Sequence, residues 1–313
     1  MVDHQVQSSA PGKAILFGEH AVVYGQPAIA VPVAEVAARA IIVPAPSGHG
    51  LSLVAPDLGQ RSTLKEARPR EPLAFAARLV LRHLAEPEPD AKVVIRSSIP
   101  MAGGLGSGAA VSAAMVRALA RFLGHSLSRG EVSRLVFEVE KIHHGTPSGI
   151  DNTVIAFEQP VYFVRREGTG PELLSVGAPL TLLIVDSGLP SSTKQLVSRV
   201  RRRWRRDPVG LEALFRQIGA VARQARGHIE MGDVGALGPL MDENHSLLIE
   251  LGVSSPTLDR LVRVAKAAGA SGAKLSGAGG GGCIVALIEL DGSRAAEALR
   301  KAGAARVIET TVR

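Results

Sequence analysis

The sequence predicts an α+β fold of two domains, residues 1–178 and residues 179–313. Three observations support this prediction. An apolar strand at 92–96 leads through a glycine-rich loop into an Ala-rich helical stretch, which is a β-loop-α unit. Near Pro179 the pattern restarts with a strongly apolar strand at 180–185. The helices and strands after it follow the order of an α+β domain, in which helices pack on one sheet.

Hydrophobic spacing and turn residues predict the other elements of the first domain. Its strands are expected at 28–33, 40–43 and 92–96, and its helices at 73–84, 109–123 and 128–143. Residues 44–50 and 56–72 are rich in turn residues and are predicted to be loops. Ser128 is expected to cap the third helix, with Glu131 completing a capping box. Gly124 is the expected end of the second helix.

In the second domain the same patterns predict helices followed by alternating strands and helices. The expected elements are two or three helices between 195 and 251, a helix at 255–269, a strand at 284–288, a helix at 294–301 and a strand at 305–312. No internal repeat of fixed period is present.

Composition indicates a chain with a large hydrophobic core. Of its 313 residues 46% are hydrophobic and 21% are charged, and no run of about 18 apolar residues suggests a membrane span. Residues 1–7 are polar and do not resemble a signal peptide. The single Cys283, followed by apolar residues, is expected to be a buried thiol in a reducing cytoplasm.

The chain carries a formal net charge of +7, with much of the excess in the arginine-rich stretch at 199–206. A nucleic-acid surface would explain this charge, but aromatic residues make up only 3% of the chain and do not alternate with the arginines. We therefore expect a solvated helix face and no nucleic-acid partner. A positive surface also suits anionic small molecules.

The most informative segment is SIPMAGGLGSGAA, residues 98–110, where a strand passes into a helix. Glycines let a backbone approach an anion closely, and a helix start offers unpaired N–H groups, so the segment suits a phosphate cradle. It is not a Walker A loop, because Ala109 and Ala110 stand where Lys and Ser or Thr would follow. Nor does a well-placed acidic residue complete a dinucleotide fingerprint. Taken alone, a glycine-rich turn without a ligand remains the simpler interpretation.

Three further segments carry polar residues that suit phosphate chemistry. Residues 11–25 place Lys13, Glu19 and His20 within eight positions. A lysine there could neutralise a developing charge, and the other two could bind hydroxyl or carboxylate groups. Polarity at a strand end explains this segment equally well.

Glu140 lies on a predicted helix, and Asp151 follows a Pro-Ser-Gly turn. Two carboxylates joined by a stiff loop can converge on one centre, one on Mg²⁺ and one beside a nucleophile. His143 and His144 are adjacent on the helix and point in different directions, so zinc is not expected. The glycines of KLSGAGGGG, residues 274–282, indicate close backbone approach in the second domain.

Together these segments resemble the three motifs of the GHMP kinase superfamily, in their expected order and over nearly the whole chain. GEHAVVYG at 18–25 and HGTPSGIDN at 144–152 resemble the mevalonate kinase branch most closely. The resemblance implies an N-terminal α/β domain with the ATP-binding glycine loop and a C-terminal ferredoxin-like α+β domain.

The resemblance also implies roles for individual residues. It implies that Asp151 and Lys13 are catalytic. It implies substrate contacts for Glu19, His20 and Thr193, and Mg²⁺ ligands in Ser107 and Glu140. It places the ATP phosphates on the loop formed by Gly103, Gly104, Leu105, Gly106, Ser107 and Gly108, with Gly279 to Gly282 completing the site.

The implied reaction is the transfer of the ATP γ-phosphate to the C5 hydroxyl of mevalonate, with ATP and Mg²⁺ as cofactors. Another small-alcohol or phospho-alcohol kinase, such as a phosphomevalonate kinase, is the alternative. No nucleic-acid or membrane partner is expected. The sequence does not fix the oligomeric state, and a homodimer is compatible with it.

Overall fold

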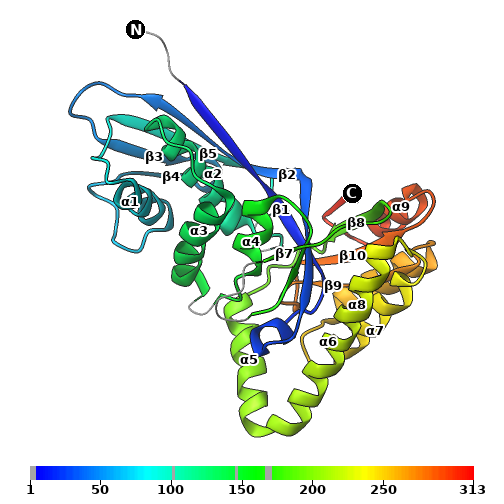
Figure 1. Cartoon of the computed structure of the whole chain (residues 1–313). Coiled ribbons are helices and arrows are strands. Elements are labelled where there is room, and N and C mark those ends of the chain that lie inside the picture. The colour runs from blue at the N-terminus through cyan, green and yellow to red at the C-terminus, as the bar shows by residue number, and fades with distance from the viewer. Residues whose placement is uncertain (1–4, 101–102, 145–146, 166–170) are drawn as a thin grey trace. The chain divides into compact units, whose positions relative to one another are not determined.

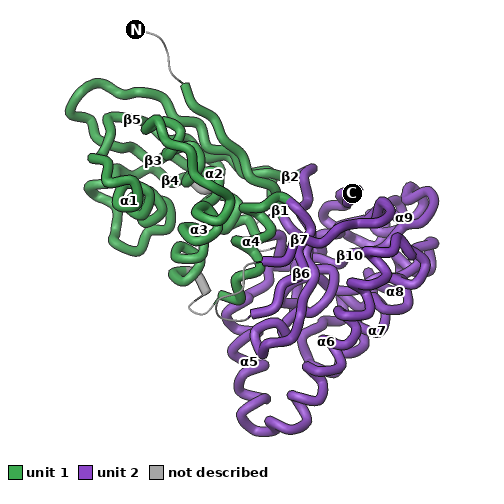
Figure 2. Tube along the Cα trace, viewed as in Figure 1, with its two compact units in different colours: residues 1–12, 36–99, 106–158 green, residues 13–35, 100–105, 159–313 purple. Residues whose placement is uncertain are grey.

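The computed structural model describes residues 5–100, 103–144, 147–165 and 171–313. The chain divides into two compact units that interleave in the sequence (Figure 2). Unit 1 contains residues 1–12, 36–99 and 106–158, and unit 2 contains residues 13–35, 100–105 and 159–313. These divisions differ from a single boundary at 178 and 179, which stays a prediction. Residues 13–35, from the first motif, belong to the same unit as the C-terminal half.

Unit 1 combines part of a mixed sheet with a group of helices (Figure 1). Its elements are the start of β1 (Val6–Phe17), most of the second half of β2 (Ala28–Pro44), β3 (Leu51–Ala55), the 3-10 turn η2 (Pro56–Leu58), β4 (Gln60–Thr63), α1 (Pro72–Leu84), β5 (Ala91–Ser97), α2 (Ser107–Phe122), α3 (Arg129–His144) and α4 (Ile150–Phe157). The strands follow the order β4-β3-β5-β2, with β3 parallel to β5 and the other pairs antiparallel. Helix α2 packs against α1, α3 and α4.

Unit 2 is built on a four-stranded antiparallel sheet of order β11-β8-β10-β9. Its elements are the end of β1, the first half of β2, the 3-10 turn η1 (Ala21–Tyr24), β6 (Val161–Phe163), β7 (Glu172–Leu173), β8 (Leu180–Asp186), α5 (Thr193–Arg206), α6 (Pro208–Met231), α7 (Leu237–Glu250), α8 (Pro256–Ala267), β9 (Gly272–Ser276), β10 (Cys283–Ile288), α9 (Ser293–Lys301) and β11 (Arg306–Val312). Helices α7 and α8 pack against β9, and α9 packs against β11. This arrangement confirms the α+β prediction.

The long, strongly periodic elements agree with the sequence predictions within a few residues. The capping box of α3 is confirmed, because Ser128 N–H donates to Glu131 Oε2 at 2.8 Å and Glu131 N–H donates to Ser128 Oγ at 3.2 Å. Gly124 follows α2 with φ +83°, as a helix-ending glycine should. Cys283 is fully buried, and burial raises the pKa of its thiol.

Several elements differ from the predictions. The two strands expected at 28–33 and 40–43 are one strand, β2, because from Glu35 to Arg39 exposed or half-buried positions alternate with the buried Val36 and Ala38. The loop predicted at 56–72 is partly wrong, because η2 and the short strand β4 lie within it, and the sequence predicted no element for β3. The sequence predicted no element for helix α4, because the Pro-Ser-Gly turn precedes a helix of only eight residues.

The arginine-rich stretch forms α5, and Val200 is its buried residue. Most of its arginines are exposed, which confirms the expected solvated face. In the part of the chain that the structure describes, no helix is long and apolar enough to span a membrane.

Candidate active site

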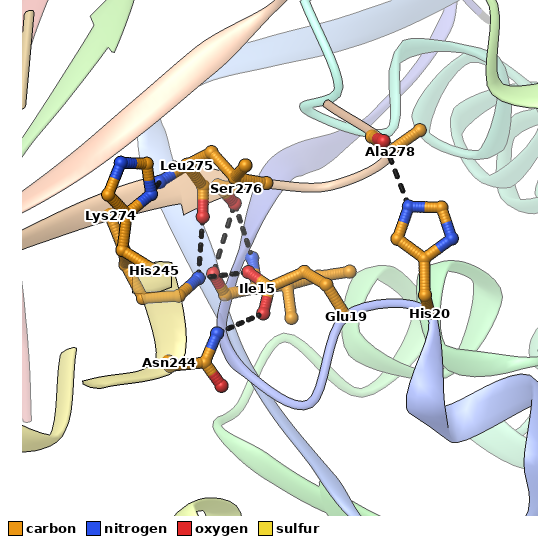
Figure 3. Close-up of polar contacts among 9 residues, drawn as sticks. All are labelled: Ile15, Glu19, His20, Asn244, His245, Lys274, Leu275, Ser276 and Ala278. Carbon is orange, nitrogen blue, oxygen red and sulfur yellow. Dashed lines mark hydrogen bonds and ion pairs between the residues drawn. The ribbon is translucent and has the colours of Figure 1, made fainter. Parts of the chain in front are cut away.

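Lys13 lies in the section of β1 that belongs to unit 2, and its side chain is buried. Its backbone N–H donates to the Leu105 carbonyl at 3.0 Å. Two residues later, Ile15 N–H donates to Ser276 Oγ at 3.0 Å, and the same hydroxyl donates to the Ile15 carbonyl at 3.0 Å (Figure 3). The backbone around Lys13 is therefore held on both sides. A lysine held in this way suits stabilisation of negative charge that develops during a reaction.

Glu19 follows β1 and has no exposed surface. One of its carboxylate oxygens pairs with the Lys274 ammonium, which is equally buried. The other accepts a hydrogen bond from Asn244 Nδ2 at 3.2 Å (Figure 3). Both oxygens of the predicted substrate-binding carboxylate are therefore engaged by side chains of unit 2. Burial lowers the pKa of Lys274, and the Glu19 carboxylate opposes this effect.

His20 has a positive φ of +58° with a ψ of −47°, a backbone conformation that is uncommon for a residue with a side chain. Its ring is buried, and Nε2 lies 2.9 Å from the Ala278 carbonyl oxygen (Figure 3). A carbonyl only accepts, so Nε2 carries the proton. Burial lowers the pKa of His20 below its ordinary value. The ring is thus neutral near pH 7, and Nδ1 can accept a hydrogen bond from a hydroxyl group.

The glycine-rich loop before α2 has the backbone of an anion site. Gly104 and Gly106 have φ values of +76° and +72°, and Leu105 between them is buried. Gly106 is the N-cap of α2, and the first helical bond runs from Ala110 N–H to the Gly106 carbonyl at 2.9 Å. The N–H groups of the first turn have no partner within the helix. They can therefore bind phosphate oxygens, as the sequence predicts.

Three predicted site residues belong to unit 1. Ser107 is the first residue of α2 and is half-buried, and Asp151 lies in the first turn of α4. Glu140 on α3 is only 3% exposed, so it is not a solvent-facing helix residue. A hydroxyl and a carboxylate suit Mg²⁺, which keeps waters and takes phosphate oxygens as further ligands. No group of three or more His, Cys, Asp or Glu residues forms a metal cluster within the described ranges.

The second glycine-rich segment, residues 277–282, packs against its own unit. A Cβ on Gly279 would lie 2.0 Å from the Val253 carbonyl oxygen, and one on Gly281 would lie 2.6 Å from the Leu189 carbonyl oxygen. Gly280 N–H donates to the Val253 carbonyl at 2.8 Å, and Gly282 N–H donates to the Leu189 carbonyl at 2.8 Å. Close backbone approach is confirmed here, as the sequence predicted.

Thr193 is the first residue of α5 and is half-buried. Ser191, two residues before it, donates from Oγ to the Gly279 carbonyl at 2.6 Å. The start of α5 is therefore tied to the second glycine-rich segment. The sequence predicts a substrate contact for Thr193, and this geometry gives it a fixed position.

Sequence reasoning assigned no role to Lys274, Asn244 or Ser276. Lys274 and Ser276 stand in the KLSGAGGGG segment, where a lysine among buried residues was a usable signal. Asn244 lies on α7, far from any motif, and nothing in its own sequence context indicated it. Lys13, Glu19 and His20 come together with these residues in unit 2. Ser107, Glu140 and Asp151 belong to unit 1, and the side chains of His143 and His144 lie outside the described residues.

Comparison with known proteins identifies the family. The family models "GHMP kinases N terminal domain" and "GHMP kinases C terminal" match residues 72–159 and 218–305. A mevalonate kinase of Thermococcus sibiricus is 36% identical over 97% of this chain and 95% of its own length.

Solved structures agree with this result. The L. major mevalonate kinase in complex with R-mevalonate has a TM-score of 0.83 and 30% identity, covering 98% of this chain and 95% of its own. A Streptococcus pneumoniae phosphomevalonate kinase has a TM-score of 0.84 at 18% identity, covering 97% and 100% of the two chains, and shows the shared fold alone. With relatives of this identity across nearly its whole length, the chain belongs to the GHMP kinase family of ATP-dependent enzymes.

Proposed function

We propose that this chain transfers the γ-phosphate of ATP to the C5 hydroxyl of (R)-mevalonate, giving 5-phosphomevalonate for isoprenoid biosynthesis. One observation carries the choice of substrate. Relatives named mevalonate kinase are 30–36% identical over 90–98% of this chain, whereas a phosphomevalonate kinase of equal structural similarity is 18% identical. The GEHAVVYG and HGTPSGIDN segments support the same choice.

In this proposal Asp151 is the general base. Its carboxylate orients the C5 hydroxyl and takes its proton while the oxygen bonds to the γ-phosphorus and the bond from phosphorus to the β-phosphate oxygen breaks. Asp151 lies in the first turn of α4. Lys13 stabilises the negative charge on the attacking oxygen.

The glycine loop and the metal ligands position ATP. The first-turn N–H groups of α2 bind phosphate oxygens, and Gly103 to Gly108 allow the backbone to approach them. Ser107 and Glu140 fit Mg²⁺ as a hydroxyl and a carboxylate ligand. When bound, the ion supplies neutralisation of the phosphate charge. Phosphoryl transfer needs mainly such positioning and charge stabilisation.

His20 and Thr193 recognise mevalonate in this proposal. The neutral His20 ring offers Nδ1 as an acceptor, since Nε2 is bonded to the Ala278 carbonyl. Thr193 offers a hydroxyl at the start of α5. A cytoplasmic location, expected from the single cysteine, and a homodimer remain predictions.

A coupled assay of ADP release tests the assignment with mevalonate, phosphomevalonate, homoserine and galactose as acceptors. Mevalonate should give the highest kcat/KM, and substrates lacking its matching groups should fall by about 10⁴-fold. A higher kcat/KM for phosphomevalonate would contradict the proposal while leaving the family unchanged. A sequence-independent nucleic-acid module would instead give a gel shift that weakens steeply with salt.

A further inference from the structure

Two segments of unit 2 that are about 260 residues apart in the sequence are joined by side chains. Glu19 pairs with Lys274, His20 bonds to the Ala278 carbonyl, and Ser276 bonds twice to the Ile15 backbone (Figure 3). Residues 13–20 carry two residues with proposed roles at the substrate. The second segment, residues 274–278, carries none.

We propose that Glu19 and Lys274 form a buried positioning pair, which fixes the turn at 18–20 and so orients the His20 ring without touching mevalonate. This inference rests on the proposed function for the role of His20. It replaces a direct substrate contact by Glu19 with an indirect one.

Burial separates the pair from any ligand. The side chains of Glu19 and Lys274 have 0% exposure. Besides its ion pair with Glu19, Lys274 Nζ donates a hydrogen bond to the Leu275 carbonyl at 2.6 Å. Asn244 Nδ2 donates a hydrogen bond to the second carboxylate oxygen of Glu19. A substrate could reach Glu19 only by breaking these contacts and opening unit 2.

The turn itself needs an anchor. Gly18 has φ +92°, and a Cβ there would lie 2.3 Å from the Pro27 carbonyl oxygen. The backbone at Gly18 therefore packs directly against the backbone at Pro27. His20 holds a positive φ despite its side chain, which costs free energy that the surroundings must offset. Glu19 lies between these two residues, and its buried ion pair holds the turn to β9.

The far end of the pair is also fixed. Leu275 N–H donates to His245 Nδ1 at 3.3 Å, and His245 Nε2 lies 3.4 Å from Asp259 Oδ1. Lys274 therefore stands on a strand that α7 and α8 both hold in place. Burying two charges costs more free energy than burying a neutral pair of similar volume. In this proposal the pair therefore contributes by allowing a single geometry and not by adding stability.

The experiment compares Lys274→Met, Glu19→Gln and the double variant with the same two changes at the exposed pair Lys301→Met and Glu297→Gln on α9. Lys274→Met alone leaves a buried carboxylate without its cation, so the melting temperature should fall by about 5–15 °C. The double variant removes both charges and should recover most of that loss. Should Lys274→Met fail to fold, the double variant alone decides the outcome. The exposed pair should change nothing.

The state of His20 is read by NMR of histidine-labelled protein, with its ring signals assigned through their loss in His20→Gln. The wild-type ring should be a single neutral tautomer with the proton on Nε2. In the stable double variant the signals should shift toward a mixture of tautomers, and kcat/KM for mevalonate should fall about 10- to 100-fold with little change in KM for ATP.

An unchanged His20 spectrum in a stable double variant would overturn the proposal. A second result would also overturn it. If Glu19→Gln changes KM for mevalonate by the same factor in the wild-type protein and in Lys274→Met, Glu19 acts on the substrate independently of Lys274, as a direct contact would. If the wild-type chain does not phosphorylate mevalonate, the proposed function fails. The melting temperatures and the His20 spectrum still decide whether the pair positions the ring.

Discussion

The two glycine-rich segments of this chain look alike in the sequence but differ in the structure. Within 277–282 an added Cβ atom would collide with a carbonyl oxygen of the same unit at two positions, 2.0 Å away at Gly279 and 2.6 Å away at Gly281. At Gly104, in the loop before α2, the corresponding distance is 3.4 Å, an ordinary contact. The loop before α2 leads into the N-terminus of that helix. The segment 277–282 instead donates backbone hydrogen bonds to the carbonyl groups of Leu189 and Val253.

This difference shows that glycine content alone does not identify a phosphate site. In the segment 277–282 glycine is needed at Gly279 and Gly281 because other parts of the backbone pack against them. The loop before α2 has room for a side chain at Gly104, and it leads into the N-terminus of a helix. In our account the first loop binds ATP phosphates. The second holds residues 13–20 and the start of α5 in position.

The largest effect is expected at Gly279. In Gly279→Ala the new methyl group would overlap the Val253 carbonyl oxygen, and φ is +82°, so we expect little or no folded protein. Gly124→Ala is the matched control, because φ there is +83° and no atom lies within 4 Å. It should cost only about 1–2 kcal/mol of unfolding free energy. Soluble yield and thermal melting are measured for both variants. An equal loss of yield and melting temperature in Gly279→Ala and Gly124→Ala would show that the close contact with Val253 does not require glycine at 279.

Asp151→Asn keeps the shape of the side chain and removes the proposed base. We expect kcat to fall about 10²-fold or more, with the affinity for ATP nearly unchanged. Lys13→Met should also lower kcat, and the double variant should lose less than the sum of the two effects, because the residues act on one reacting group. Steady-state kinetics and nucleotide titration provide the values. Full additivity would show that the two residues act independently.

Glu140→Gln removes one negative charge from the proposed metal site. The Mg²⁺ concentration for half-maximal rate should rise by about tenfold and kcat should fall, because a carboxylate binds a hard cation better than an amide does. A Mg²⁺ titration of the rate, with melting curves as the control for folding, makes the measurement. An unchanged titration curve would exclude Glu140 as a ligand and leave Ser107 alone.

Gly104→Ala tests the open loop directly and should have the smallest effect on the fold. The methyl group would lie 3.4 Å from the Ser276 carbonyl oxygen, so the main cost is the φ of +76°, about 1–2 kcal/mol. KM for ATP should rise several-fold, since the methyl group narrows the approach of phosphate to the backbone. A large loss of stability with an unchanged KM for ATP would mean that both loops are mainly structural.

The sequence was sufficient for the features that depend on local pattern. Strong periodicity predicted α1, α2 and α3 together with β8, and the spacing of Ser128 and Glu131 predicted the capping box. Short elements such as α4 and β4 gave too few periods to be recognised. Lys13, Glu19 and His20 were found through the first motif.

The buried network behind that motif could not be predicted in the same way. Asn244 reaches Glu19 across 225 positions of sequence, and Ser276 reaches Ile15 across 261. Such contacts depend on how β1, β9 and α7 assemble in three dimensions. A single sequence carries no local pattern for that assembly. For this reason the sequence predicted a substrate contact for Glu19 and gave no sign that Lys274 and Asn244 bind its carboxylate.

Hydrogen–deuterium exchange, followed by peptide mass spectrometry, tests the division between the two loops most directly. The protein is measured alone and with Mg²⁺ and a non-hydrolysable ATP analogue. Backbone amides at 103–109 should exchange readily in the free protein and slow by about tenfold or more with nucleotide, while the hydrogen-bonded amides of Gly280 and Gly282 should exchange slowly in both states. Rapid exchange of the Gly280 and Gly282 amides in the free protein, or no effect of nucleotide at 103–109, would contradict the account.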